Sequence, residues 1–194
     1  MFRTINVNLL GGAGCGKTVL MADVFSALKK AGQTAEMVQE LVKDLVWEGR
    51  LHELKNQAGI AEAQYRVFKS RQTKTRFVVT DGPLAHALYY NRHYPHDSNI
   101  EETESQALAW LSEFEAVNLF LTRGDFKYEQ EGRYQTEAES KAMDEPLWTA
   151  LAPHIPLRRL PPFPSPERIA KELIRLAGSA NLEAASLTEA FRWD

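Results

Sequence analysis

One glycine-rich stretch limits the fold of this chain more than any other part of its sequence. Residues 11–18 read GGAGCGKT and fit the pattern G-x-x-x-x-G-K-[ST]. They follow the apolar run Ile5–Leu10, which predicts a buried strand, and lead into Lys17–Lys30, where apolar residues recur at helical spacing. A glycine-rich turn that joins a strand to a helix is typical of a phosphate-binding loop. The sequence therefore predicts a site for a nucleoside triphosphate.

The residue types of this loop suit phosphate binding. Glycines allow successive backbone N–H groups to point at phosphate oxygens, and the helix directs its positive end at the same anion. We expect Lys17 to reach the β- and γ-phosphates and Thr18 to offer its hydroxyl to Mg²⁺. The rest of the predicted nucleotide-binding set is Gly12, Ala13, Gly14, Cys15 and Gly16. The alternative for Cys15, a catalytic thiol, lacks an identifiable base.

The remaining elements alternate between strands and helices. Further strands are predicted at residues 34–38, 77–80, 118–121 and 155–160, and helices at 41–47, 51–72, 108–114 and 166–176. This alternation predicts an α/β protein with the P-loop NTPase fold: a five-stranded, mostly parallel sheet with helices on both faces. We expect one domain over residues 1–178 and a C-terminal helical tail over 179–194, which packs on the domain or on a partner.

Composition excludes several classes of protein. Hydrophobic residues make up 44% and charged residues 25%, which is ordinary for a globular domain, and the formal net charge is -3, so no global positive field attracts nucleic acid. The single cysteine excludes an internal disulfide framework. No stretch approaches the roughly 20 apolar residues of a membrane helix, and no cleavable signal precedes the loop. We expect a cytoplasmic protein without membrane association, and the oligomeric state stays open.

Two carboxylates are candidates for catalysis. A GTPase would need an Asn-Lys-x-Asp segment, which the chain lacks. Asp81 directly follows an apolar strand, as the Mg²⁺-holding carboxylate of a Walker B segment does, although a turn-forming role is the alternative. Glu40 lies just beyond the strand predicted at 34–38 and is a candidate general base for a hydroxyl acceptor. Its alternative is a solvated glutamate at a helix start.

A polar segment after the fourth strand predicts a lid, at about residues 123–140. Arg123 and Arg133 lie within it, and arginines carried by a closing lid stabilise the charge of phosphoryl transfer. The alternative is an ordinary surface loop with solvated arginines.

Two further segments are candidates for acceptor binding. Residues 83–96 are dense in aromatic and cationic side chains, which suit stacking on a base but also a core-facing amphipathic helix. Residues 66–76 carry five basic side chains and no acid, which suits either a phosphate backbone or a solvated helix face.

Several motifs together resemble those of bacteriophage P-loop kinases. The segments are GGAGCGKT at 11–18, QELVKDLVWEGR at 39–50, IAEAQYRVF at 60–68, TDGPLAHALYYN at 80–91 and NLFLTRGDFKYEQEGRYQTEAES at 118–140. This family is related to nucleoside monophosphate kinases and includes the 5-hydroxymethyluridine DNA kinases. The resemblance implies ATP binding by Gly14, Gly16, Lys17 and Thr18, with Asp81 and Glu40 as the acidic pair.

The resemblance also implies a reaction and a setting. Its most specific form is ATP- and Mg²⁺-dependent phosphorylation of the 5-hydroxymethyl group of 5-hydroxymethyl-deoxyuridine in phage DNA, in the host cytoplasm. The partner is then a nucleotide or DNA that contains a modified base. Two alternatives stay open: a free deoxynucleoside monophosphate kinase, which the acidic net charge favours, and a regulatory P-loop ATPase without an acceptor.

Overall fold

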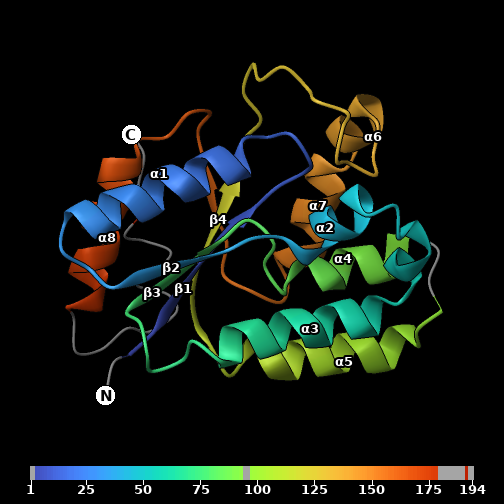
Figure 1. Ribbon diagram of the computed structural model, residues 1–194, viewed down its shortest axis with the longest axis horizontal. Helices are drawn as coiled ribbons and strands as arrows, with labels where there is room; N and C mark the ends of the chain where they lie inside the picture. The colour runs from blue at the N-terminus through green and yellow to red at the C-terminus, as the bar shows by residue number, and fades with distance from the viewer. Residues whose placement is uncertain (1–2, 94–96, 179–190, 192–194) are drawn as a thin grey trace.

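The computed structural model describes residues 3–93, 97–178 and 191, which form a parallel sheet between layers of helices (Figure 1). The strands are β1 (Ile5–Leu10), β2 (Ala35–Val38), β3 (Phe77–Thr80), β4 (Glu115–Leu121) and β5 (Arg158–Leu160). Their order in the sheet is β2-β3-β1-β4-β5, and every pairing is parallel. The predicted α/β class and the five-stranded sheet are confirmed.

Helices cover both faces of this sheet. They are α1 (Lys17–Lys30), α2 (Leu41–Trp47), α3 (Gln57–Lys69), α4 (His86–His93), α5 (Ile100–Leu111), α6 (Glu137–Ala142), α7 (Asp144–Leu151) and α8 (Pro166–Ala177), with a 3-10 helix η1 (Leu51–Lys55) before α3. In Figure 1, α1 and α8 lie on one side of the sheet, and α3, α4, α5 and α7 lie on the other. None of the described helices combines the length and the apolar character that crossing a bilayer requires.

The central strand β1 explains why both layers are needed. Ile5, Val7 and Leu9 are buried against α1 and α8, whereas Leu10 is buried in the cluster formed with α3, α4 and α7. A strand that buries side chains on both faces is typical of a parallel sheet covered by helices on each side. The carboxyl end of β1 therefore delivers the glycine-rich loop to one edge of a rigid scaffold.

Some predicted boundaries were wrong. The helix predicted at 51–72 is interrupted at Asn56, whose side chain accepts a hydrogen bond from the Gly59 N–H and so begins α3. The helices α6 and α7 were not predicted, although Thr136 and Glu139 form a capping box at the start of α6. By contrast, the helix predicted at 166–176 is confirmed as α8, whose first turn is capped by the Ser165 side chain.

One residue of the C-terminal tail belongs to the core. Phe191 is only 3% exposed and lies in the hydrophobic cluster that α1 and α8 form with the sheet. The other residues of the predicted helical tail, 179–190 and 192–194, lie outside the described residues. The predicted packing of the tail on the domain can therefore be assessed only at Phe191, which does pack on it.

We predict that Phe191→Ala destabilises the protein, because it leaves a cavity between the sheet and its helices. The expected loss is about 3 kcal/mol in the free energy of unfolding, measured by urea denaturation. Phe163→Ala is the control, since Phe163 is 62% exposed. Equal effects of the two changes would contradict a core role for Phe191.

Candidate functional site

The glycine-rich loop is covered by the segment that follows β4. Gly14 and Gly16 have φ values of 73° and 98°, which favour glycine. A Cβ on Gly14 would lie 2.7 Å from Arg133 Nη1, and a Cβ on Gly16 would lie 2.6 Å from the Phe126 ring. The predicted lid therefore rests directly on the loop, and the two glycines provide the space for it.

Within the loop, the two side chains of chemical interest are buried. Lys17 is 8% exposed, and its Nζ donates hydrogen bonds to the carbonyl oxygens of Gly11 at 2.8 Å and Gly12 at 2.9 Å. Cys15 is 2% exposed and belongs to the hydrophobic core beneath the loop. Its placement favours a packing role for the thiol over a catalytic one.

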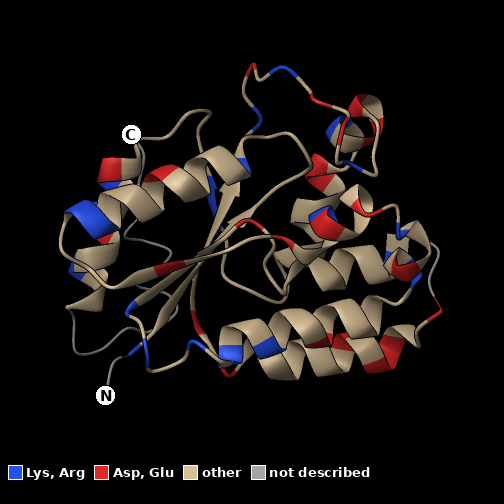
Figure 2. Ribbon diagram, in the orientation of Figure 1, with Lys and Arg blue, Asp and Glu red and all other residues tan. Residues whose placement is uncertain are grey.

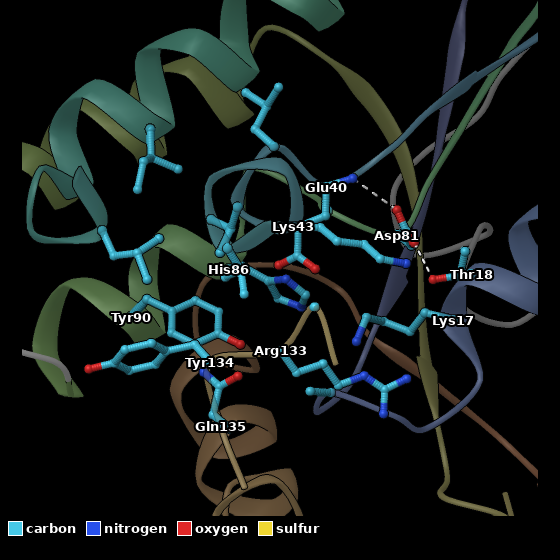
Figure 3. Close-up of a pocket in the computed structure, with 18 of the residues that line it drawn as sticks. Lys17, Thr18, Glu40, Lys43, Asp81, His86, Tyr90, Arg133, Tyr134 and Gln135 are labelled. Atoms are coloured by element: carbon cyan, nitrogen blue, oxygen red, sulfur yellow. Dashed lines mark hydrogen bonds between the residues drawn. The ribbon is translucent and has the colours of Figure 1, made fainter. Parts of the chain in front are cut away.

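Asp81 connects the ends of three strands. Its Oδ2 accepts a hydrogen bond from Thr18 Oγ1 at 2.6 Å, and its Oδ1 accepts one from the Glu40 backbone N–H at 3.1 Å (Figure 3). The next residue, Gly82, is packed so tightly that a Cβ there would lie 2.5 Å from Glu40 Cα. The structure thus brings together the loop threonine and both carboxylates that the sequence singled out.

Glu40 lies at the start of α2 and lines the same cavity as Lys17. Burial raises the pKa of the Glu40 carboxyl, and the charge of Asp81 raises it further, whereas the charges of Lys17, Lys43 and Arg133 oppose this. A carboxylate that holds its proton more tightly than usual is a stronger base once ionised.

The pair Thr18 and Asp81 fits a magnesium ion. Both offer oxygen atoms, and Mg²⁺ prefers oxygen ligands, takes few of them from the protein and keeps several waters. Across residues 3–93, 97–178 and 191, no group of three or more His, Cys, Asp or Glu side chains is placed to hold a metal. The donor set therefore resembles that of a metal shared with phosphates rather than an all-protein cage.

Of the two predicted lid arginines, Arg133 faces the cavity. Its guanidinium stacks on the Tyr128 ring at 4.6 Å from the centroid, and it lines the cavity beside Gly14. Its buried Nη1 has no hydrogen-bond partner among the described residues. Figure 3 shows this guanidinium close to Lys17, so both cations lie where phosphates are expected.

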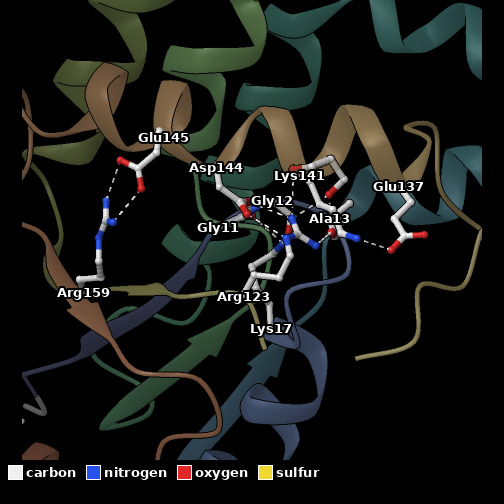
Figure 4. Close-up of polar contacts among 11 residues, drawn as sticks. Gly11, Gly12, Ala13, Lys17, Arg123, Glu137, Lys141, Asp144, Glu145 and Arg159 are labelled. Carbon is white, nitrogen blue, oxygen red and sulfur yellow. Dashed lines mark hydrogen bonds and ion pairs between the residues drawn. The ribbon is translucent and has the colours of Figure 1, made fainter. Parts of the chain in front are cut away.

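Arg123 is placed differently, behind the loop (Figure 4). Its Nε donates to Asp144 Oδ2 at 2.8 Å, its Nη1 donates to the Ala13 carbonyl at 2.9 Å, and its Nη2 donates to Ser140. Asp144 Oδ1 also accepts the Gly12 N–H at 3.1 Å. These contacts indicate that Arg123 positions the loop, while direct contact with phosphates stays a prediction.

A cavity of about 450 Å³ extends from the loop to the helices α2, α3 and α4, with the lid along one side. This volume is in the usual range for small-molecule sites. His86 lines it and is 6% exposed, yet neither of its ring nitrogens has a partner among the described residues. Burial, and then the charge of Lys17, lower the pKa of His86 to about 3. The imidazole is therefore neutral at physiological pH.

Sequence reasoning missed His86 and also Gln64, which lines the cavity from α3. Within residues 83–96 it singled out the aromatic and cationic side chains as a group. Tyr89 is buried and stacks on His93 at 4.0 Å, as the core-facing alternative expected, whereas Tyr90 lines the cavity. Tyr94 lies outside the described residues. The only signal for His86 was its position shortly after Asp81 in the sequence.

The basic segment 66–76 is remote from this site. It precedes β3 and so lies at the amino edge of the parallel sheet, whereas the loop lies at the carboxyl edge. Figure 2 shows its basic residues at the end of α3, away from the loop. Arg66 pairs with Glu62 at 2.5 Å and Lys69 with Glu113 at 2.6 Å. These pairs match a solvated helix face rather than a track for a nucleic acid bound at the site.

Comparison with known proteins agrees with this geometry. The model of a family described as AAA domain matches residues 6–167. The chain belongs to this AAA domain family. Together with the five-stranded parallel sheet, this match confirms the predicted P-loop NTPase fold. None of the curated proteins compared with the chain is similar enough in sequence to count as a relative.

Two solved structures are similar in their overall arrangement. The Mycobacterium tuberculosis APS kinase CysC in complex with AMPPNP and APS is 17% identical, with a TM-score of 0.47, over 92% of this chain and 100% of that one. The thymidylate kinase from Candida albicans is 9% identical, with a TM-score of 0.46, over 89% of this chain and 90% of that one. At such low identities and TM-scores, neither likeness bears on the substrate of this chain.

We predict that His86 makes the stability of the protein depend on pH. The pKa of His86 in the folded state lies below its ordinary value of 6.5. At a pH between these two values, the imidazole is therefore protonated in the unfolded state and neutral in the folded state. His86 therefore does not reduce the free energy of unfolding above about pH 6.5, and it reduces this free energy progressively as the pH falls toward 3. Between about pH 7 and about pH 5, this one group should cost about 2 kcal/mol in the free energy of unfolding.

Urea denaturation at both pH values measures this loss. His86→Phe should remove it, and His154→Phe, which alters an exposed histidine, should leave it unchanged. An unchanged pH dependence in His86→Phe would contradict a neutral, buried imidazole.

Proposed function

We propose that the protein is an ATP-dependent phosphotransferase, a kinase that transfers the γ-phosphoryl group to a hydroxyl of a nucleotide-type acceptor. One observation carries this proposal: a single cavity joins the phosphate-binding loop to a second, mostly apolar chamber between α2, α3 and α4. An ATPase that hydrolyses ATP without an acceptor needs no such chamber. The attacking water of such an ATPase makes no use of apolar contacts, whereas a larger acceptor molecule would pack against these walls.

The residues at the loop end suit the triphosphate. Lys17 and Arg133 place two positive charges on the side where the γ-phosphate is expected. Thr18 and Asp81 would hold Mg²⁺, which neutralises charge on the β- and γ-phosphates when it is bound. Arg123 and Asp144 keep the start of the loop in position from behind.

The transfer itself is an in-line displacement. The acceptor oxygen forms a bond to the γ-phosphorus while the bond from that phosphorus to the bridging oxygen breaks, and ADP leaves with that electron pair. The acceptor hydroxyl proton passes to the Glu40 carboxylate, which lines the cavity between the loop and the chamber. The Glu40 N–H bond to Asp81 keeps the base beside the proposed metal residues.

The most specific candidate acceptor is the one that the resemblance to bacteriophage P-loop kinases implies, the 5-hydroxymethyl group of 5-hydroxymethyl-deoxyuridine in phage DNA. A base within a duplex must leave the stack to enter an enclosed cavity. The same enclosure supports a second candidate, a free deoxynucleoside monophosphate. Within residues 66–76, Arg66 and Lys69 pair with acidic side chains, and the segment lies at the edge of the sheet opposite the site. It therefore does not provide a basic surface that would hold DNA beside the site, which also favours the free nucleotide.

An acceptor panel tests the function. Labelled ATP and Mg²⁺ are supplied with DNA that contains 5-hydroxymethyl-deoxyuridine, with unmodified DNA, and with each free deoxynucleoside monophosphate. We expect transfer of label to a nucleotide acceptor. Label on modified DNA supports the DNA kinase, and label on mononucleotides alone rejects it in favour of the second candidate. ATP hydrolysis that no acceptor stimulates would reject the kinase altogether.

We predict that Glu40→Gln lowers kcat by ~10²-fold or more, because the acceptor hydroxyl loses its proton acceptor. Binding of ATP, measured by calorimetry, should persist because the backbone N–H bond to Asp81 does not depend on the side chain. Glu36→Gln is the matched control, since Glu36 is exposed on β2. Unchanged turnover in Glu40→Gln would remove Glu40 from the role of base.

A further inference from the structure

The far end of the cavity has the composition of a site for a flat, mostly apolar ligand. We call this end the acceptor chamber, and its walls come from η1, α3, α4 and the turn before α4. Its apolar lining consists of Leu51, Leu54, Ile60, Ala61, Leu84 and Ala87. In Figure 3, Tyr90 marks this end and Lys17 and Thr18 mark the loop end. Most cations that line the cavity belong to the α2, loop and lid sides. The chamber side contributes Lys55, the last residue of η1, which is an exposed residue.

Two polar side chains in the acceptor chamber lack hydrogen bonds. His86 is 6% exposed and neither ring nitrogen is paired, and Gln64 is 5% exposed with its Nε2 unpaired, in the described part of the chain. By contrast, the neighbouring Gln57 is satisfied, because its Nε2 donates to the Leu54 carbonyl at 2.6 Å. Buried polar groups without partners destabilise a folded protein, so two of them in one cavity call for a ligand that pairs with both.

The chemistry of these groups selects the ligand. Burial keeps the His86 imidazole neutral, so it offers one donor and one acceptor nitrogen rather than a positive charge. Gln64 offers amide N–H donors. The Tyr90 ring meets His86 edge to face, with centroids 5.9 Å apart, and so adds a flat aromatic wall. A phosphate or carboxylate would instead favour the cations near the loop, such as Lys17, Lys43 and Arg133.

We infer that the acceptor chamber binds an uncharged nucleobase ring, and that His86 and Gln64 select it by hydrogen bonds to its polar edge. A nucleobase combines an apolar π-face with ring nitrogens and carbonyl or amino groups at its edge, which matches the apolar walls and the two unpaired side chains. This inference deepens the proposed function and rests on it for the ligand's role as phosphoryl acceptor.

Direct binding to the full chain tests the inference without turnover. Calorimetry is performed with the four common deoxynucleoside monophosphates, with 2-deoxyribose 5-phosphate and with inorganic phosphate. We expect at least one nucleotide to bind ~10-fold or more tightly than 2-deoxyribose 5-phosphate. Equal binding of the sugar phosphate and of all four nucleotides would overturn the inference, because the ring would then contribute nothing.

Substitutions then test the two side chains. Gln64→Leu and His86→Phe should each weaken binding of the preferred nucleotide by ~10-fold or more, because each removes a hydrogen bond to the ring. The matched controls Gln33→Leu and His154→Phe alter side chains outside the cavity and should leave binding unchanged. Full affinity in both chamber variants would overturn the inference.

Stability measurements separate ligand recognition from a structural role. Gln64→Leu replaces an unpaired buried amide with an apolar group of similar size, so the ligand-free variant should be at least as resistant to urea as the parent protein. A loss of stability in Gln64→Leu that fully accounts for weaker binding would overturn a recognition role for Gln64.

The outcomes also distinguish this inference from the proposed function. Nucleotide binding that depends on His86 and Gln64, without transfer from ATP to any acceptor, would reject the kinase and keep the base site. Transfer that proceeds in both variants with an unchanged KM for the acceptor would keep the kinase and reject the base site.

Discussion

The hydrogen bonds of Asp81 are the constraint on which the site depends. One carboxylate oxygen accepts the hydroxyl of Thr18, and the other accepts the backbone N–H of Glu40. These partners follow β1 and β2, while Asp81 follows β3, which lies between those two strands in the sheet. Asp81 is 4% exposed, so its carboxylate is largely shielded from bulk water. The spacing of a loop hydroxyl, a proposed metal carboxylate and a proposed base is thus set by adjacent rigid strands.

The lid is integrated with the phosphate-binding loop rather than laid over it loosely. Phe126 and Arg133 occupy the space that a missing Cβ leaves at Gly16 and Gly14. The ring of Trp47 on α2 is equally close to Gly132, where a Cβ would lie 2.6 Å from it. Contacts of this kind join the loop, the lid and α2 into one closely packed unit.

Local patterns in the sequence predicted the parts of the structure that local interactions determine. The bounds of β1, α1, α2 and β3 follow from apolar periodicity and from glycines at the turns. The placement of Asp81 and Glu40 beside the loop was also predicted, because strands of a parallel sheet end at the same edge.

Pairings between distant residues were not predictable in the same way. Arg123 and Arg133 look alike in the sequence, and it is partners distant in the chain, such as Ala13 and Asp144, that hold Arg123 behind the loop. His86 and Gln64 read as ordinary polar residues of helices, because nothing local reveals that a cavity, and not solvent, faces them. The sequence left open whether the basic segment 66–76 follows a phosphate backbone or forms a solvated helix face, and only the sheet topology places it at the edge opposite the loop.

The two ends of the lid meet at a single backbone atom. Arg123 at its start and Ser140 at its end both donate a hydrogen bond to the carbonyl oxygen of Ala13. The intervening residues therefore form a closed loop whose base is anchored to the phosphate-binding loop. Changing the length of such a loop alters its closure entropy only slightly, by about 0.6 kcal/mol for each doubling. Insertions and deletions between these anchors therefore cost little in closure entropy and leave the base of the lid attached to the phosphate-binding loop.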